Sequence, residues 1–263
     1  MQILVFVKPV PEAETRLRPT ADGRRLDTDG VKFVLSGYDE SAVEQALLLK
    51  EALPGTQVRA VTFGTSPRSE EVLRSALALG CDAATWVEAP TGSEPELRET
   101  VRALAAASRK FPAELYLLGQ QSLDTEAGMV PTALAAALGL PGTNGAVNLR
   151  FDGSRQLLCF DRERGGEIES WEFPVPGVIG LKQAANDPRA AKLQNILKSR
   201  KLPIDRIPAS ELPAAVADAG TVRPALFTLP PARTGAKLIE YTSPEDAAHK
   251  LVRILREEAK VFP

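Results

Sequence analysis

Several residue types that mark common protein classes are scarce in this 263-residue sequence. The two cysteines, Cys81 and Cys159, are too few for a disulfide framework, so we expect each to be a small buried residue in a reducing compartment. The single histidine, His249, and the lack of clustered cysteines argue against a metal site. We expect this histidine to lie on the surface.

Long apolar runs are also missing. None reaches the roughly 20 residues that a membrane helix needs. The apolar start MQILVFVKPV carries no basic leader and no small-residue cleavage site, so we expect a first β-strand there and no signal peptide. These features predict a protein that is not membrane-embedded, located in the cytoplasm or, in a eukaryote, in the mitochondrial matrix.

Charge and motif content exclude further classes. The net charge is −2, which gives no sign of nucleic acid or an anionic membrane as partner. The sequence lacks a glycine-rich dinucleotide motif, a Walker lysine and a nucleophile placed beside a base. With 44% hydrophobic and 25% charged residues, it has the composition of an ordinary soluble globular protein. We therefore predict no catalytic residues.

The first half of the chain alternates between continuous apolar runs and amphipathic stretches. We expect strands at 3–7, 58–63, 83–89 and 114–119, and helices at 38–53, 67–79, from about 97, and at 132–140. Ser66 is expected to cap the second helix and Gly80 to end it. This pattern predicts an α/β fold, a parallel sheet flanked by helices, in which ligands bind at the carboxyl ends of the strands.

The second half has a different character. Residues 145–182 alternate in strand fashion between turn signals, which predicts an antiparallel meander attached to the sheet. Residues 186–237 are rich in proline and charge and have little core of their own. A last helix is expected from Pro244, capped by Ser243. We therefore predict an α/β domain over residues 1–185, and a partner-docking arm with a C-terminal helix over 186–263.

One loop, LLGQQSLDTEAG at residues 117–128, stands between an expected strand and the helix after it. Pro131 is tolerated only in the first turn, so that helix should begin near Gly128 or Met129. The free N–H groups there form an anion site that suits phosphate. Asp124 could accept hydrogen bonds from backbone amides or a ribose hydroxyl. The residues alone equally allow Asp124 to cap the turn, with water on the donors.

Six segments in order resemble the β (small) subunit of electron transfer flavoproteins, almost from end to end. They are ILVFVKPVPE, DGVKFVLSGYDESAVEQALLLKE, LRSALALGCDAATWVE, LLGQQSLDTEAGMVPTALAAALGLP, NDPRAAKLQNILKSRKLPI and PPARTGAKLI. The resemblance implies an adenine-nucleotide-binding-like α/β domain paired with an α subunit that carries the redox-active FAD. It also implies a bound AMP or, in electron-bifurcating members, a second FAD.

The resemblance further implies a nucleotide site. Its residues would be Phe6, Ser36, Gly37, Tyr38, Asp39, Phe63, Gly119, Gln120, Gln121, Ser122, Leu123, Asp124, Thr125, Glu126, Ala127, Gly128, Met129 and Val130. Within it, Gln120 replaces the family's usual lysine, Met129 a common glutamine, and Ser36-Gly37 an asparagine-proline turn. These changes remove side-chain contacts to phosphate and keep backbone contacts, so AMP and a second FAD both stay open.

A docking role is implied for one leucine and the basic residues after it: Leu193, Lys198, Arg200 and Lys201. An apolar anchor in a basic frame suits transient docking to a partner dehydrogenase. The spacing of Leu193, Ile196 and Leu197 also fits a helix packed on the protein's own core. Gln194 stands where the family has proline, so the shape of this loop and the identity of its docking partner both stay open.

For each of three aromatic residues the sequence allows two alternative roles or locations. Tyr38 either shields the flavin of the α subunit or fills the end of the sheet. Trp86 and Trp171 are expected in the core or at a subunit interface.

The resemblance implies an electron carrier and not an enzyme. It would take electrons from flavoprotein dehydrogenases and pass them to a quinone oxidoreductase or another acceptor. One alternative is a bifurcating flavoprotein with a second FAD and NADH as donor. Another is a stand-alone adenine-nucleotide sensor, which would be a stable monomer.

Overall fold

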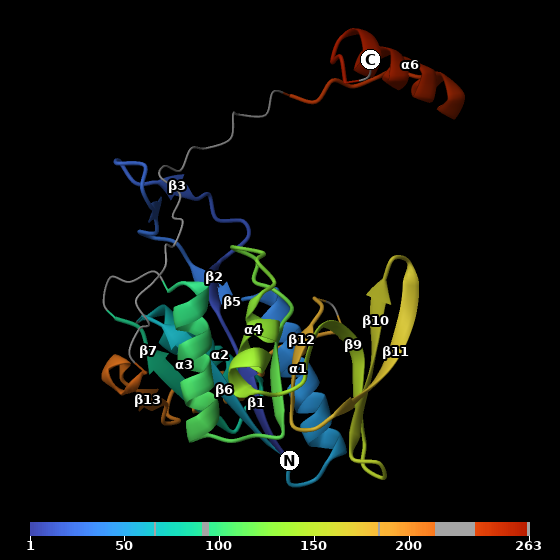
Figure 1. The fold of residues 1–263 in the computed structure, drawn as a ribbon. Helices are drawn as coiled ribbons and strands as arrows, with labels where there is room; N and C mark the ends of the chain where they lie inside the picture. Colours follow the sequence, from blue (N-terminus) through green and yellow to red (C-terminus); the bar gives the residue numbers. More distant parts are fainter. Residues whose placement is uncertain (66, 91–94, 184, 214–234, 262–263) are drawn as a thin grey trace. The chain divides into compact units, whose positions relative to one another are not determined.

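The computed structural model describes residues 1–263 except 66, 91–94, 184, 214–234 and 262–263 (Figure 1). The chain forms two compact units. The first comprises residues 1–17 and 28–223, and the second residues 18–27 and 224–263. The described residues of each unit are considered by themselves.

The first unit is built on a nine-stranded sheet in the order β11-β10-β9-β12-β8-β1-β6-β7-β13. Six strands form its parallel part: β1 (Gln2–Phe6), β6 (Gln57–Gly64), β7 (Ala83–Glu88), β8 (Leu115–Gly119), β12 (Gly177–Leu181) and β13 (Asp205–Ile207). Residues 3–6 of β1 and the whole of β8 are buried, as expected of strands covered on both faces. The predicted α/β fold with a parallel sheet is confirmed.

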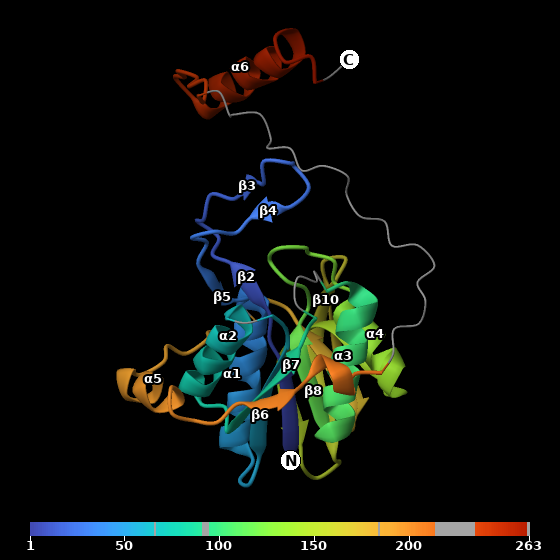
Figure 2. The same ribbon diagram turned by 90° about the vertical axis from the view of Figure 1, so that its left-hand side faces the viewer.

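Helices cover both faces of this sheet (Figure 2). They are α1 (Gly37–Ala52) and α2 (Arg68–Leu79) on one face, and α3 (Leu97–Lys110) and α4 (Val130–Leu138) on the other. Strand β1 divides its side chains accordingly, because successive residues point to opposite faces. Ile3 and Val5 join the core beneath α1 and α2, whereas Leu4 and Phe6 join the core beneath α3 and α4.

The helix boundaries follow the predicted signals closely. Gly80 ends α2, where its N–H donates to the carbonyl groups of Ala76 and Leu77. Helix α4 begins at Val130, one or two residues after the predicted start at Gly128 or Met129, with Pro131 in its first turn. The predicted cap Ser66 lies outside the described residues.

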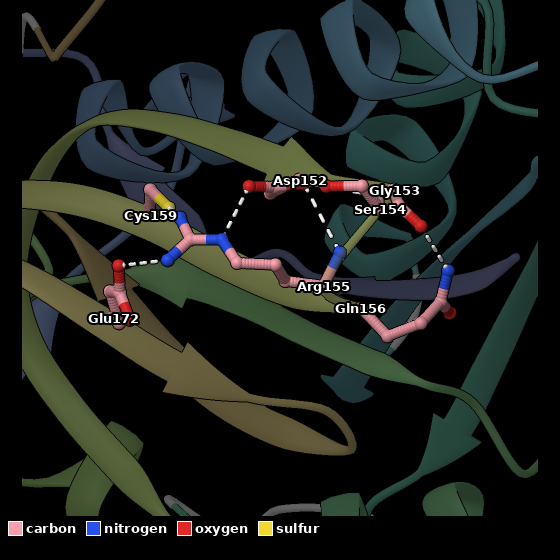
Figure 3. A network of polar contacts seen from close by, with 7 residues as sticks. All are labelled: Asp152, Gly153, Ser154, Arg155, Gln156, Cys159 and Glu172. Carbon is pink, nitrogen blue, oxygen red and sulfur yellow. Dashed lines mark hydrogen bonds and ion pairs between the residues drawn. The ribbon is translucent and has the colours of Figure 1, made fainter.

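Three strands form the antiparallel part: β9 (Gly142–Asp152), β10 (Leu157–Arg164) and β11 (Glu167–Pro174). The β9–β10 turn is closed by Asp152, which accepts hydrogen bonds from the N–H groups of Ser154 and Arg155 (Figure 3). Arg155 also pairs with Glu172, so one side chain links the turn to β11. The predicted meander is confirmed for these three strands.

The prediction that the fourth strand of this region, β12 (Gly177–Leu181), belongs to the antiparallel meander is wrong. This strand lies between β8 and β9 and runs parallel to both, with Val178 opposite Tyr116 and Ile179 opposite Thr143. All five of its residues are buried. Its sequence GVIGL is a continuous apolar run, which suits a central parallel strand and not an alternating edge.

The remaining described elements of the first unit are short. Strands β2 (Pro9–Pro11) and β5 (Phe33–Leu35) pair with each other, and the chain after β12 forms α5 (Leu193–Ser199), β13 and a single 3-10 turn, η1 (Ala209–Glu211). Strand β13 pairs with β7 and buries Ile207, whereas most other described residues after 186 are exposed or partly buried, as expected of a segment with little core of its own.

The second unit contains the strand pair β3 (Arg18–Pro19) and β4 (Leu26–Asp27), and the helix α6 (Pro244–Glu257). Ser243 Oγ accepts a hydrogen bond from Asp246 N at 3.2 Å, so the predicted cap and the predicted start at Pro244 are both confirmed. His249 is exposed, as predicted. Among the described residues, no helix combines the length and apolar character needed to cross a membrane.

The cysteines and tryptophans can also be placed. Cys81 and Cys159 are free thiols and buried, as predicted. Trp86 lies in the core, where its indole N–H donates to the carbonyl of Gly64. Trp171 on β11 is 43% exposed, so its predicted place in the core is wrong, and a place at an interface stays a prediction.

Candidate functional site

The candidate site lies at the carboxyl end of β1 and β8, where open α/β sheets place their ligands. The loop of residues 119–130 follows β8, and Lys8 follows β1 after a single residue. Helix α1 begins beside both. The structure therefore brings the first turn of α1 together with the loop, as the sequence predicts.

Asp39 in the first turn of α1 joins these segments. One carboxylate oxygen accepts a hydrogen bond from Lys8 N and the other from Gly119 N, both at 2.9 Å. The side chain is buried, and burial raises the pKa of Asp39 to about 7, against the opposing effect of the two hydrogen bonds. Both oxygens accept hydrogen bonds from the protein's own backbone, so Asp39 ties the first turn of α1 to the loop and to the segment after β1.

Gly119 allows this close contact between β8 and α1. A Cβ atom there would lie 2.5 Å from Tyr38 Cβ and 2.6 Å from Asp39 Oδ1, which is closer than real side chains approach. The glycine is therefore required by space. Any side chain at this position would push the first turn of α1 away from the loop.

The aromatic residues predicted for the site occupy different environments. Tyr38 is half-buried, and its hydroxyl accepts a hydrogen bond from Gln121 Nε2 at 3.0 Å. Phe6 points into the core and stacks on Tyr116, with ring centroids 6.5 Å apart. Phe63 packs against the same core. Of these three, Tyr38 alone makes a polar contact with the loop. Because the side chain of Phe6 points into the core, Phe6 would contact a ligand through its backbone atoms.

The loop itself is held at both ends. Asn144 Nδ2 donates to the carbonyl of Gln120 at 3.3 Å and to that of Gly128 at 3.0 Å. Between them, Glu126 N donates to Ser122 O, and Glu126 adopts a left-handed backbone with φ of 50°. Asn144 was not predicted from the sequence, because it approaches the loop from β9.

The start of α4 presents open donors. Its cap residue Met129 makes no capping hydrogen bond through its side chain. The backbone N–H groups of Gly128, Met129 and Val130 donate to nothing else in the described part of the chain. A helix start of this kind attracts anions.

A lysine that the sequence analysis missed reaches into the loop. Lys8 Nζ lies 2.8 Å from Asp124 Oδ1, 2.7 Å from Oδ2 and 3.3 Å from Ser122 Oγ. Partial burial alone would raise the pKa of Asp124, but the ammonium of Lys8 and the hydrogen bonds outweigh it and lower that pKa. The available signal was a lysine directly after a buried strand.

This donor set fits a phosphate. Open amides, an ammonium and a hydroxyl are the groups that recognise phosphate oxygens. The hydroxyl of Ser36, just before α1, is buried at the same edge without a hydrogen-bond partner among the described residues. The remaining predicted residues are Leu123, Thr125 and Ala127, which are exposed on the loop, and Gly37, which is the partly buried first residue of α1.

The predicted docking residues lie elsewhere, on and after α5. Leu193 is 72% exposed and Leu197 53%, so these side chains do not pack on the protein's own core. Their docking role stays a prediction. The segment around α5 is held by ion pairs of Arg189 with the buried Glu44 and with Glu51, and by Arg74 of α2, which donates to the carbonyl of Ser199.

The chain is similar to known proteins over its whole length. The family described as "Electron transfer flavoprotein domain" matches residues 24–212. The electron transfer flavoprotein subunit beta of Bacillus subtilis is 30% identical over 267 residues, covering 100% of both chains. The subunit beta of Homo sapiens is 32% identical over 260 residues, covering 97% of this chain and 98% of its own, and that of Syntrophomonas wolfei is 30% identical over 261 residues, covering 99% and 98%.

Proposed function

The chain belongs to the electron transfer flavoprotein family, among its β subunits, and from this premise we propose that it is one half of a heterodimeric electron carrier in the cytoplasm. The other half is an α subunit that holds the redox-active FAD. The complex takes electrons from flavoprotein dehydrogenases and passes them to a quinone oxidoreductase or another acceptor.

We infer that the loop of residues 119–130 holds the phosphate of AMP. The observation that carries this inference is the set of open amides at Gly128, Met129 and Val130, next to a loop that Asn144 fixes at both ends. Preorganised amides hold an anion without a further ordering cost. Within this site Tyr38 either faces the flavin of the α subunit or closes the end of the sheet.

The same loop would serve a second FAD in a bifurcating flavoprotein, since FAD also contains an AMP half. The open amides would hold a phosphate of either nucleotide. The electron carrier and the bifurcating flavoprotein would therefore differ in which nucleotide this loop binds, and not in where the nucleotide binds.

We further propose that α5 docks the dehydrogenase. Leu193 is exposed at the start of a short helix, and Lys198, Arg200 and Lys201 follow it. An exposed leucine supplies apolar area, and basic residues steer an acidic partner. Arg189 holds the chain just before α5, and Arg74 holds the last residue of α5, so Leu193 lies on a fixed segment and docking costs less conformational entropy.

Co-expression with an α subunit of the family tests the proposal. We expect a one-to-one complex with the absorption spectrum of bound flavin, which a flavoprotein dehydrogenase with its substrate bleaches. Size-exclusion chromatography and anaerobic spectroscopy are sufficient. A chain that stays monomeric and binds adenine nucleotide by itself would contradict the proposal and favour the stand-alone sensor.

A further inference from the structure

We propose that Lys8 is the cation that makes this loop accept a phosphorylated nucleoside in preference to an unphosphorylated one. The inference rests on the proposed nucleotide site and assigns a role to a residue outside the loop. It begins from the charge of the loop. Residues 119–130 contain Asp124 and Glu126 and neither lysine nor arginine, so the loop by itself would repel a phosphate.

Lys8 is the side chain that offsets this charge. Among the described residues, it is the one cation that pairs with a carboxylate of the loop. Its ammonium lies within 2.8 Å of both carboxylate oxygens of Asp124. An ammonium has three N–H donors. Of its acceptors, Ser122 Oγ at 3.3 Å is the most distant, so a phosphate oxygen can take that place while the pair with Asp124 is kept.

The backbone of Lys8 is fixed while its side chain stays accessible. Lys8 N donates to Asp39, and Ser36 N donates to Lys8 O at 3.2 Å. The side chain is nevertheless 44% exposed, and that of Asp124 27%. A ligand can therefore reach the ion pair from solvent, and the ammonium can turn toward it without a change in the fold.

The chemistry distinguishes phosphate from ribose. A ribose hydroxyl bonds to Asp124 whether or not Lys8 is charged, whereas a phosphate dianion held by the open amides is bound more tightly when a positive charge lies beside it. Lys8 should therefore contribute to the affinity for AMP and leave the affinity for adenosine nearly unchanged. A charge-assisted hydrogen bond of this kind corresponds to a change of about tenfold to a hundredfold in affinity.

The test compares two ligands on the heterodimer after its nucleotide has been removed. Calorimetric titration with AMP and with adenosine gives a ratio of affinities for the wild type and for Lys8→Met. We expect this ratio to fall at least about tenfold in Lys8→Met through the loss of AMP affinity. Lys8→Arg keeps the charge and should keep most of the ratio. Lys110→Met removes another half-exposed, ion-paired lysine, on α3 and away from the loop, and should leave the ratio unchanged.

Two results would overturn the inference. In one, AMP and adenosine lose affinity together in Lys8→Met, which indicates a structural role. In the other, neither changes. If the unmodified heterodimer binds neither AMP nor adenosine, the proposed nucleotide site itself fails. If Lys8→Met does not fold, the test uses Lys8→Arg and the wild type at several salt concentrations. A charge role predicts that the two proteins have equal AMP-to-adenosine affinity ratios at low salt and that both ratios fall as the salt concentration rises. A ratio insensitive to salt contradicts it.

Discussion

Gly119→Ala should destabilise the protein by roughly 3 kcal/mol and abolish retention of the nucleotide. The added methyl group would lie 2.5 Å from Tyr38 Cβ and 2.6 Å from Asp39 Oδ1. Relief requires the first turn of α1 to move, and this movement breaks the hydrogen bond from Gly119 N to Asp39. Chemical denaturation measures the loss of stability, and chromatography of the released nucleotide measures the loss of binding.

Gly153→Ala is the matched control for this prediction. In the β9–β10 turn, the nearest atom to an added Cβ would be a ring carbon of Phe151 at 4.0 Å, which is ordinary contact. We expect that variant to stay within about 0.5 kcal/mol of the wild type. A Gly119→Ala protein as stable as the control, with its nucleotide retained, would show that the close approach of α1 and β8 is not needed.

Leu193→Ala should weaken docking of the dehydrogenase by about tenfold to a hundredfold, while reduction of the flavin by a small chemical reductant stays unchanged. The side chain of Leu193 is exposed and is not part of the hydrophobic core, so its truncation should not destabilise the fold. The effect should therefore fall on the concentration of dehydrogenase that gives half-maximal flavin reduction. Steady-state assays over a range of dehydrogenase concentrations measure it.

The control is Leu48→Ala, which trims another exposed leucine, on α1. It should leave the half-maximal concentration within about twofold of the wild type, as expected for a surface substitution away from the contact. Equal behaviour of the two variants would place the docking contact away from Leu193 and remove the proposed role of α5.

The central part of the fold could be predicted because its signals are local. Continuous apolar runs such as β8 and β1, and caps such as Ser243, are encoded within a few residues. The start of α4 followed from Pro131 alone, to within two residues. These features depend on the chain's own neighbours and need no knowledge of which strands are adjacent.

The remainder depends on pairs far apart in the sequence. Strand β12 was assigned to the meander because its neighbour in the sequence is β11, yet its partners are β8 and β9. The ion pair of Lys8 and Asp124 joins residues 116 positions apart, and no period in the sequence reports such a contact. The burial of Asp39 was hidden for the same reason, since its two partners come from β8 and from the segment after β1.

The nucleotide content of the purified heterodimer tests the central claim most directly. The complex is denatured, and FAD and AMP are quantified by chromatography against the protein concentration. The account predicts one FAD and one AMP per heterodimer, with the AMP lost in Gly119→Ala and the FAD retained. Two FAD molecules and no AMP would contradict it and make the complex a bifurcating flavoprotein. One FAD with no second nucleotide would show that the loop of residues 119–130 is not a nucleotide site.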